Sequence, residues 1–121
     1  MISKDMFDEF ALPYLREQTQ WLDKSMYHLD GVDAIKHLDS VLSLENLNAL
    51  QWTPGAGQPD GGDETWDFIY EKALDHEKSI YALVAPWNIP RFVKKFGKKG
   101  VYIVTMAKDQ AMADAIVAGK Y

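Results

Sequence analysis

A histidine and an aspartate two positions apart, His28 and Asp30, are the residues in this sequence best suited to acid–base chemistry. They close a short apolar stretch, and side chains two positions apart on a strand share a face, with Cα atoms roughly 7 Å apart. An imidazole beside a carboxylate can exchange protons with a ligand, and the two groups can also bind a divalent metal ion, although weakly. The alternative is that Asp30 caps the next helix and His28 is a hydrogen-bonded core histidine, which the spacing alone leaves open.

Polar and aromatic side chains follow the next two apolar stretches. Gln51 and Trp52 end the second stretch, and Gln58 lies in the loop after it. Trp87 and Asn88 come just after the third. Amides orient small molecules by hydrogen bonds and tryptophan offers a stacking surface, so we expect these five residues to bind a substrate. A turn-rich loop with a packed tryptophan, followed by a capped helix, would give the same pattern.

Four stretches of strand length alternate with segments of helical spacing. The expected strands cover residues 25–29, 49–52, 79–85 and 101–105, and a helix kinked near Glu9 by Pro13 precedes the first. This alternation predicts an α/β fold with a leading helix, four βα units and a parallel sheet whose faces are both covered. Ligands bind beyond the carboxyl ends of parallel strands, where the candidate residues stand.

Composition limits the function classes. The 121 residues fit one domain, 1–121, and a formal net charge of -5 speaks against nucleic acid or an anionic membrane as the main partner. The absence of cysteine excludes disulfides and thiolate metal sites. The sequence has no apolar run of transmembrane length and no nucleotide-binding glycine motif, so we expect a cytoplasmic protein that binds a small molecule.

Some side chains are expected to be structural. Trp21 and Trp66 follow helical apolar spacing and are predicted to lie in the core, whereas His37 and His76, beside charged residues, are predicted at the surface. The segment 53–63, rich in glycine and proline, is the most flexible segment expected.

Three segments together resemble the uroporphyrinogen decarboxylase-like family. Residues 2–14 are similar to the family helix that begins Ile-Ser-Pro and reaches a Pro-Tyr pair. Residues 27–31, Tyr-His-Leu-Asp-Gly, look like the family's His-x-x-Gly strand end, and residues 49–52 look like its next strand, which also ends close to a tryptophan.

The resemblance implies the C-terminal half of a TIM-type (β/α)₈ barrel, in a family of haem-pathway decarboxylases (lyases) and corrinoid-linked methyltransferases. In the methyltransferase branch a His-x-Cys strand end and a later cysteine bind zinc; here His28 matches the histidine, Asp30 replaces the first cysteine, and no later cysteine exists. We expect a domain nearer methyl transfer or tetrapyrrole-linked chemistry that is incomplete as a single chain. The alternative is a non-catalytic binding or assembly module on the same half-barrel scaffold.

A half-barrel also predicts a partner. Four parallel strands leave two unpaired sheet edges and an inner face that four further strands would cover. We expect either a homodimer, which completes the barrel or packs sheet against sheet, or a missing N-terminal half. An open sheet of flavodoxin-like kind is the competing architecture.

Overall fold

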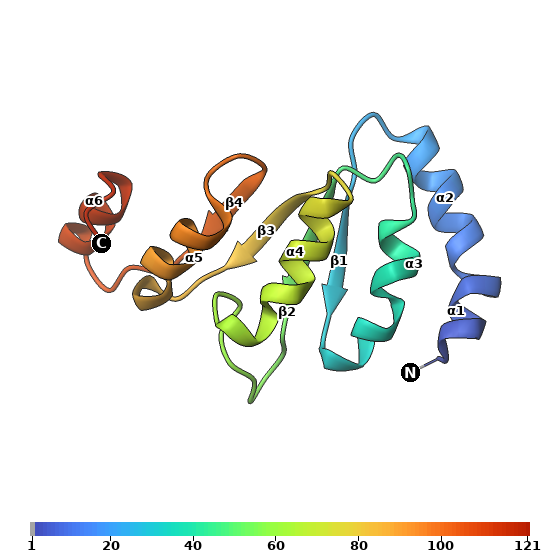
Figure 1. The fold of residues 1–121 in the computed structure, drawn as a ribbon, viewed down its shortest axis with the longest axis horizontal. Helices are drawn as coiled ribbons and strands as arrows, with labels where there is room; N and C mark the ends of the chain where they lie inside the picture. Colours follow the sequence, from blue (N-terminus) through green and yellow to red (C-terminus); the bar gives the residue numbers. More distant parts are fainter. Residues whose placement is uncertain (1) are drawn as a thin grey trace.

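Residues 2–121 are described by a computed structural model, whose centre is a four-stranded sheet (Figure 1). The strands are β1 (Met26–Asp30), β2 (Ala49–Thr53), β3 (Ser79–Leu83) and β4 (Val101–Val104). All neighbouring pairs are parallel and the order is β1-β2-β3-β4. The predicted α/β class with a parallel sheet is therefore confirmed.

Helical segments connect the strands and flank them. The α-helices are α1 (Lys4–Phe10), α2 (Leu12–Trp21), α3 (Leu38–Leu42), α4 (Asp67–Asp75), α5 (Ile89–Phe96) and α6 (Gln110–Val117). Short 3₁₀ segments, η1 (Val32–His37), η2 (Glu64–Trp66) and η3 (Pro86–Asn88), lead into α3, α4 and α5. None of the helices within residues 2–121 is long and apolar enough to cross a bilayer.

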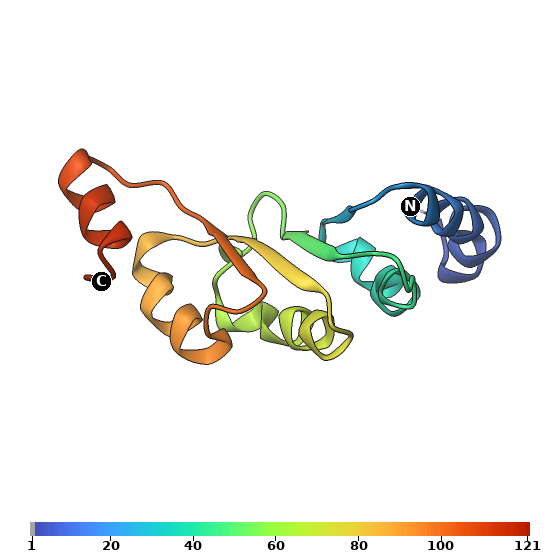
Figure 2. The ribbon, with the colours of Figure 1, turned by 90° about the horizontal axis from the view of Figure 1, so that it is seen from above.

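The helix layer covers one face of the sheet only. Figure 2 shows α3, α4 and α5 beneath the sheet, with α1–α2 beyond the β1 end and α6 beyond the β4 end. The sequential strand order, with every connection on the same side, gives an open sheet like half of a barrel. The expectation that both faces are covered is wrong for this chain, and so is the flavodoxin-like alternative, which needs helices on both faces.

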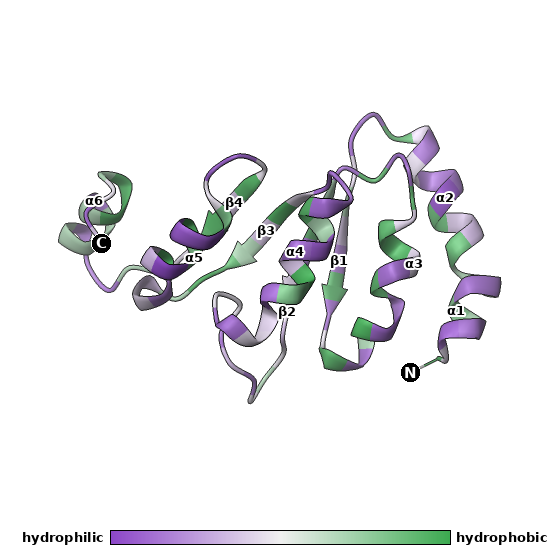
Figure 3. Ribbon diagram, viewed as in Figure 1, coloured by the Kyte–Doolittle hydropathy of each residue, from purple (hydrophilic) through white to green (hydrophobic). Residues whose placement is uncertain are grey.

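The core lies between this helix layer and the sheet. Leu50 of β2 and Ile80 of β3 alternate with residues of the open face and are almost fully buried. From the helices, Ile69 and Phe92 have no exposed surface. Fully burying an aliphatic or aromatic side chain stabilises the fold by about 1.5–3 kcal/mol, so this one-sided core fixes the helix layer on the sheet. Figure 3 colours the ribbon by hydropathy and shows hydrophobic residues, in green, on these strands and helices.

Local signals set several helix ends. The Ser3 side chain accepts a hydrogen bond from the Met6 amide and caps α1. Pro13 stands in the first turn of α2 and the helix breaks at Ala11, so the predicted kink becomes a boundary. Gly119 ends α6 with φ 72°, and its amide donates a hydrogen bond to the Ile116 carbonyl oxygen at 3.0 Å.

Two predictions about burial fail. Trp21 is 84% exposed, because α2 turns its leucine side toward the core and leaves the tryptophan outside. His37 is buried at 4% exposure, because α1 folds back over η1 and places Phe7 on its ring. Trp66, at 4% exposure, lies in the core and His76 is exposed, both as predicted.

Candidate functional site

A row of polar side chains crosses the helix-free face of the sheet. His28 of β1 pairs with Gln51 of β2, Gln51 pairs with Tyr81 of β3, and Tyr81 pairs with Tyr102 of β4. Their immediate neighbours along each strand pack toward the helices, so period-two alternation turns these four side chains outward together. In a closed barrel this face would be the interior.

His28 is held between two polar partners. Its Nδ1 atom lies 3.0 Å from Gln51 Oε1, and its Nε2 atom lies 3.6 Å from Asp30 Oδ2. With Gln51 Oε1 as the acceptor, Nδ1 carries the proton and Nε2 faces the carboxylate. Protonation of Nε2 would complete an ion pair with Asp30. Alternatively, a ligand hydroxyl or amine placed between Nε2 and the Asp30 carboxylate would donate a hydrogen bond to either of them. The arrangement can therefore accept and return a proton.

The same contacts decide between the two interpretations of the His-x-Asp pair. The His28 and Asp30 side chains are 52% and 63% exposed, so His28 is not a core histidine. The residue preceding η1 is Gly31, and no side-chain hydrogen bond caps that segment, so Asp30 is not its cap. Both side chains lie on the open face near the carboxyl end of β1, as the spacing predicts.

The far half of the row is aromatic. The rings of Tyr81 and Tyr102 stack with centroids 5.2 Å apart and an interplanar angle of 18°. Tyr102 is 61% exposed, which leaves one ring surface of the pair open to a ligand or a further strand. A phenol hydroxyl both donates and accepts hydrogen bonds, so the row offers polar contacts from β1 to β4.

A carboxylate fastens the long loop after β2. Asp60 accepts hydrogen bonds from the amide of Gly62 at 2.7 Å, the amide of Ala85 at 3.2 Å and the side-chain amide of Asn88 at 2.9 Å. These bonds tie the loop to the segment that follows β3. The loop expected to be the most flexible is thus held by several polar contacts.

Two glycines let this loop lie directly on β3. A Cβ atom at Gly61 would stand 2.5 Å from the carbonyl oxygen of Leu83, and one at Gly62 would meet the side chain of Val84. The buried Tyr70 hydroxyl donates to the Gly61 carbonyl oxygen at 2.6 Å, and burial raises the pKa of this phenol. Close backbone approach, which only glycine permits, therefore builds this part of the site.

Between the fastened loop and the end of β3 lies a cavity of about 570 Å³. Its wall includes Pro54, Gln58, Leu83, Trp87 and Met106. Trp87 is 78% exposed and Met106 80% exposed, so both surfaces are available to a ligand. The cavity wall in this chain contains no lysine or arginine, and its carboxylate, Asp60, is already bonded to three donors. An uncharged apolar group suits it best.

The structure does not bring the seven candidate residues together in one place. His28, Asp30 and Gln51 lie together on the open face, and Gln58 and Trp87 line the cavity. Trp52 also lines the cavity, but it turns to the helix side at 1% exposure and packs against Trp66 with centroids 5.1 Å apart, so it offers no stacking face beside His28.

The amide of Asn88 is committed to Asp60 and acts as a loop anchor in this structure. This partner could not be predicted from the sequence, because Asp60 lies 28 positions earlier in a loop.

The donor set does not fit the zinc ion that the family resemblance implies. His28 and Asp30 supply two groups, and within residues 2–121 no cluster of three or more histidine, aspartate, glutamate or cysteine side chains could hold a metal. Protein zinc sites use three or four protein ligands, so no chemical step is assigned to a metal here.

Tyr81, Tyr102 and Asp60 are the site residues that sequence reasoning missed. Each tyrosine stands between aliphatic residues in its strand, and the strands were interpreted as covered on both faces. A tyrosine between two aliphatic residues, in β3 and again in β4, was the available signal. Asp60 had no such signal, since two of its three partners, Ala85 and Asn88, follow β3 in the sequence.

The chain matches no protein-family model, and neither a curated protein nor a solved structure matches it significantly. The uroporphyrinogen decarboxylase-like resemblance therefore stays a prediction from the quoted segments.

Proposed function

We propose that this chain is the ligand-binding C-terminal half of a (β/α)₈-barrel enzyme of the uroporphyrinogen decarboxylase-like family, nearer its methyl-transfer branch. The observation that carries the proposal is the polar row His28–Gln51–Tyr81–Tyr102 on the face that would line a barrel. In barrel enzymes, reacting groups stand at the carboxyl ends of the strands, where Asp30 and the apolar cavity adjoin this row.

In this proposal the two parts of the site have different tasks. His28 exchanges a proton with the ligand, Gln51 fixes the imidazole through Nδ1, and Asp30 stabilises the imidazolium form. The cavity beside Trp87 holds an apolar, uncharged portion of the ligand, since no cation of this half faces it. Carboxylates or phosphates of the ligand would then need their cations from the other half of the barrel.

A matched pair of probes tests the binding part. We expect 2-naphthamide, which is neutral, to shift the Trp87 indole resonance in NMR spectra of the chain, and 2-naphthoate, which differs by its charge, to bind more weakly. Trp87→Ala should abolish the accompanying shifts of the loop amides that line the cavity, such as that of Gln58. Trp21→Ala is the control, because Trp21 is exposed to a similar extent but lies on α2, outside the cavity. Equal binding of both probes, or equal loss in both variants, would contradict the proposed ligand class.

The second candidate is a non-catalytic assembly module, favoured by the exposed apolar side chains at both ends of the helix layer, such as Phe10 and Val117. In the assembled protein, His28→Gln distinguishes the two. A proton-transfer role predicts a loss of roughly 10²–10⁴-fold in turnover with unchanged ligand affinity, whereas an assembly module predicts no turnover to lose.

A further inference from the structure

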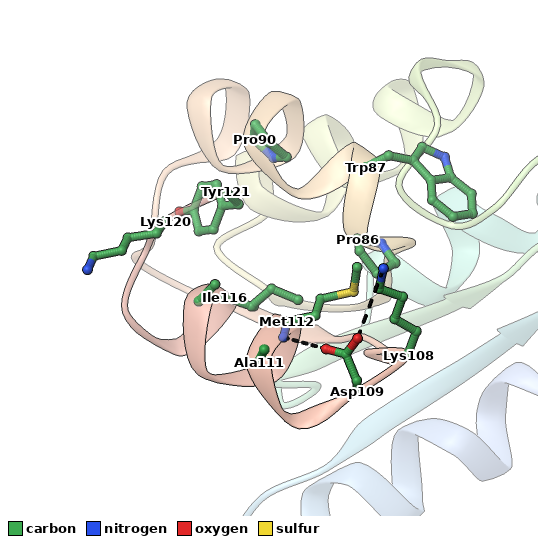
Figure 4. A pocket seen from close by; sticks show the side chains of 11 residues that line it. Pro86, Trp87, Pro90, Lys108, Asp109, Ala111, Met112, Ile116, Lys120 and Tyr121 are labelled. Atoms are coloured by element: carbon green, nitrogen blue, oxygen red, sulfur yellow. Dashed lines mark hydrogen bonds and ion pairs between the residues drawn. The ribbon is translucent and has the colours of Figure 1, made fainter.

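Charged side chains also border two cavities away from the His28 row. The larger cavity, of about 600 Å³, lies between the start of α5 and α6 (Figure 4). In its wall a cation and a carboxylate already lie together, because Lys108 Nζ is 4.0 Å from Asp109 Oδ2. The same carboxylate caps α6 by accepting a hydrogen bond from the Met112 amide at 2.8 Å. The smaller cavity differs, since its charges of opposite sign have no such partners.

This smaller cavity, of about 340 Å³, lies between α2 and the segment that follows α3. Its volume is at the lower end of the range of roughly 300–1,000 Å³ that is usual for ligand cavities, but those are mostly apolar. Here every residue of the wall has a polar side chain. A small and strongly polar ligand therefore suits it. The wall consists of Arg16, Thr19, Gln20, Ser43, Glu45 and Asn46.

One side of the cavity is a single face of α2. Arg16 and Gln20 are four positions apart and Thr19 stands between them, so helical spacing turns the three side chains to the same side. Thr19 is 7% exposed, and its hydroxyl donates to the Arg16 carbonyl oxygen at 3.0 Å. The longer side chains of Arg16 and Gln20 are exposed. They are therefore available to a ligand above the buried threonine.

A buried lysine holds the opposite side in place. Lys78 is 7% exposed, and its ammonium group donates to the carbonyl oxygens of Leu44 at 2.8 Å and Glu45 at 3.3 Å. Leu44 and Leu47 are themselves buried in the core on either side of Glu45 and Asn46. The backbone that carries these two exposed polar side chains is thus fixed from below.

The two opposite charges of the cavity remain uncompensated. Among residues 2–121, no ion pair includes Arg16 or Glu45. Hydrogen bonds from side chains reach only the backbone carbonyl oxygens of Arg16, Glu45 and Asn46. A guanidinium group and a carboxylate therefore border one small cavity without neutralising each other or another group of this chain.

We propose that this cavity binds a free α-amino acid. The Arg16 guanidinium group binds the α-carboxylate of the ligand, for which its forked donors are suited, and the Glu45 carboxylate binds the α-ammonium group. The side-chain amides of Gln20 and Asn46 offer donors and acceptors to a polar ligand side chain. The site lies where the strands begin, since Glu45 and Asn46 precede β2, so this inference does not depend on the chemistry proposed for His28.

Three ligands of different charge test the proposal. L-asparagine carries both charged groups, L-asparaginamide lacks the carboxylate, and N-acetyl-L-asparagine lacks the ammonium group. In NMR titrations of the full chain, L-asparagine should shift the backbone amides of Thr19 and Asn46 until the site is saturated. Each analogue should bind about tenfold more weakly, because one charge-assisted hydrogen-bonded contact is lost.

Two variants assign each charge to its partner. Arg16→Gln should weaken L-asparagine by about tenfold without weakening L-asparaginamide, which has no carboxylate to lose. Glu45→Gln should likewise weaken L-asparagine without weakening N-acetyl-L-asparagine. Lys24→Gln and Glu17→Gln are the matched controls, because they make the same charge changes at exposed positions outside the cavity. Both controls should bind all three ligands as the unmodified chain does.

Several results would overturn the proposal. These are the absence of saturable shifts at Thr19 and Asn46, equal affinity for the three ligands, a loss in only one of the two cavity variants, or an equal loss in a control. His28→Gln should bind L-asparagine normally, so failure here leaves the function proposed for the His28 row untouched, and failure there leaves this site untouched.

Discussion

The imidazole of His37 lies nearly parallel to the ring of Phe7, with the ring centroids 4.3 Å apart and an interplanar angle of 18°. This stack joins α1 to η1. Neither ring nitrogen of His37 has a hydrogen-bond partner in the described chain. Burial lowers the pKa of His37, Lys36 and Lys4 add to the lowering, and Asp8 opposes it. The folded chain therefore holds His37 neutral.

The stability of the fold should consequently fall at mildly acidic pH. The pKa of His37 lies below the value of about 6.5 for an unfolded chain, so the unfolded state takes up a proton first as pH falls. The contribution of neutral His37 is complete above about pH 6.5 and is lost as pH drops toward the folded-state pKa. Urea midpoints should fall between about pH 7.5 and about pH 5.5. The decrease should be smaller in His37→Phe and unchanged in the control His76→Gln; an equal decrease in all three would contradict the assignment.

Alanine at either glycine of the fastened loop should destabilise the chain by about 1–3 kcal/mol, since the added Cβ overpacks the end of β3. At Gly62 the obstacle is the Val84 side chain, so Val84→Ala should relieve part of the destabilisation caused by Gly62→Ala. A double-mutant cycle should then show a favourable coupling energy between the two positions. At Gly61 the obstacle is the Leu83 carbonyl oxygen, so no such compensation should occur. Urea unfolding of the single and double variants measures both. Coupling of the same size at the two positions would show that the close approach is not as described.

Removal of the Asp60 carboxylate should loosen the loop. Asp60→Ala leaves three donors without their acceptor, a loss of about 1–3 kcal/mol, and amides of residues 54–62 should exchange faster with deuterium. Asp63→Ala is a suitable control, because that carboxylate bonds only to Thr65 next to it and caps η2. The control should lose stability without faster exchange across the loop. Unchanged exchange in Asp60→Ala would mean that the loop is fixed by other contacts.

Zinc should bind this chain weakly. His28 and Asp30 provide two ligands where structural and catalytic sites use three or four. Titration calorimetry should show no stoichiometric uptake at micromolar zinc, and dialysis should leave no bound metal. Stoichiometric zinc that is lost in His28→Ala but kept in His76→Ala would refute this expectation.

The sequence predicted the strands well because each is a short apolar run bounded by turn residues, and β1 through β4 fall within one or two residues of the expected ranges. It also placed His28 and Asp30 on one face, since alternation is a local property. It failed where the answer depends on distant parts of the chain. Trp21 was predicted in the core but is exposed, and His37 was predicted at the surface but is buried. Helical spacing identifies a face of a helix without identifying what covers it. The presence of helices on only one face of the sheet was not predicted, for the same reason. Apolar strands have the same sequence pattern whether their second face is covered by helices or lines the interior of a barrel.

The bonds that fasten the loop to the end of β3 also bear on how fast a ligand would enter the cavity. Loops that close over a ligand often set the rate of binding and release on the microsecond to millisecond scale. Here Asp60 and the Tyr70 hydroxyl already hold the loop against β3, so entry past Trp87 requires no prior ordering of the backbone. Association would then be set by diffusion and orientation, and differences in affinity between related ligands would reside in their residence times.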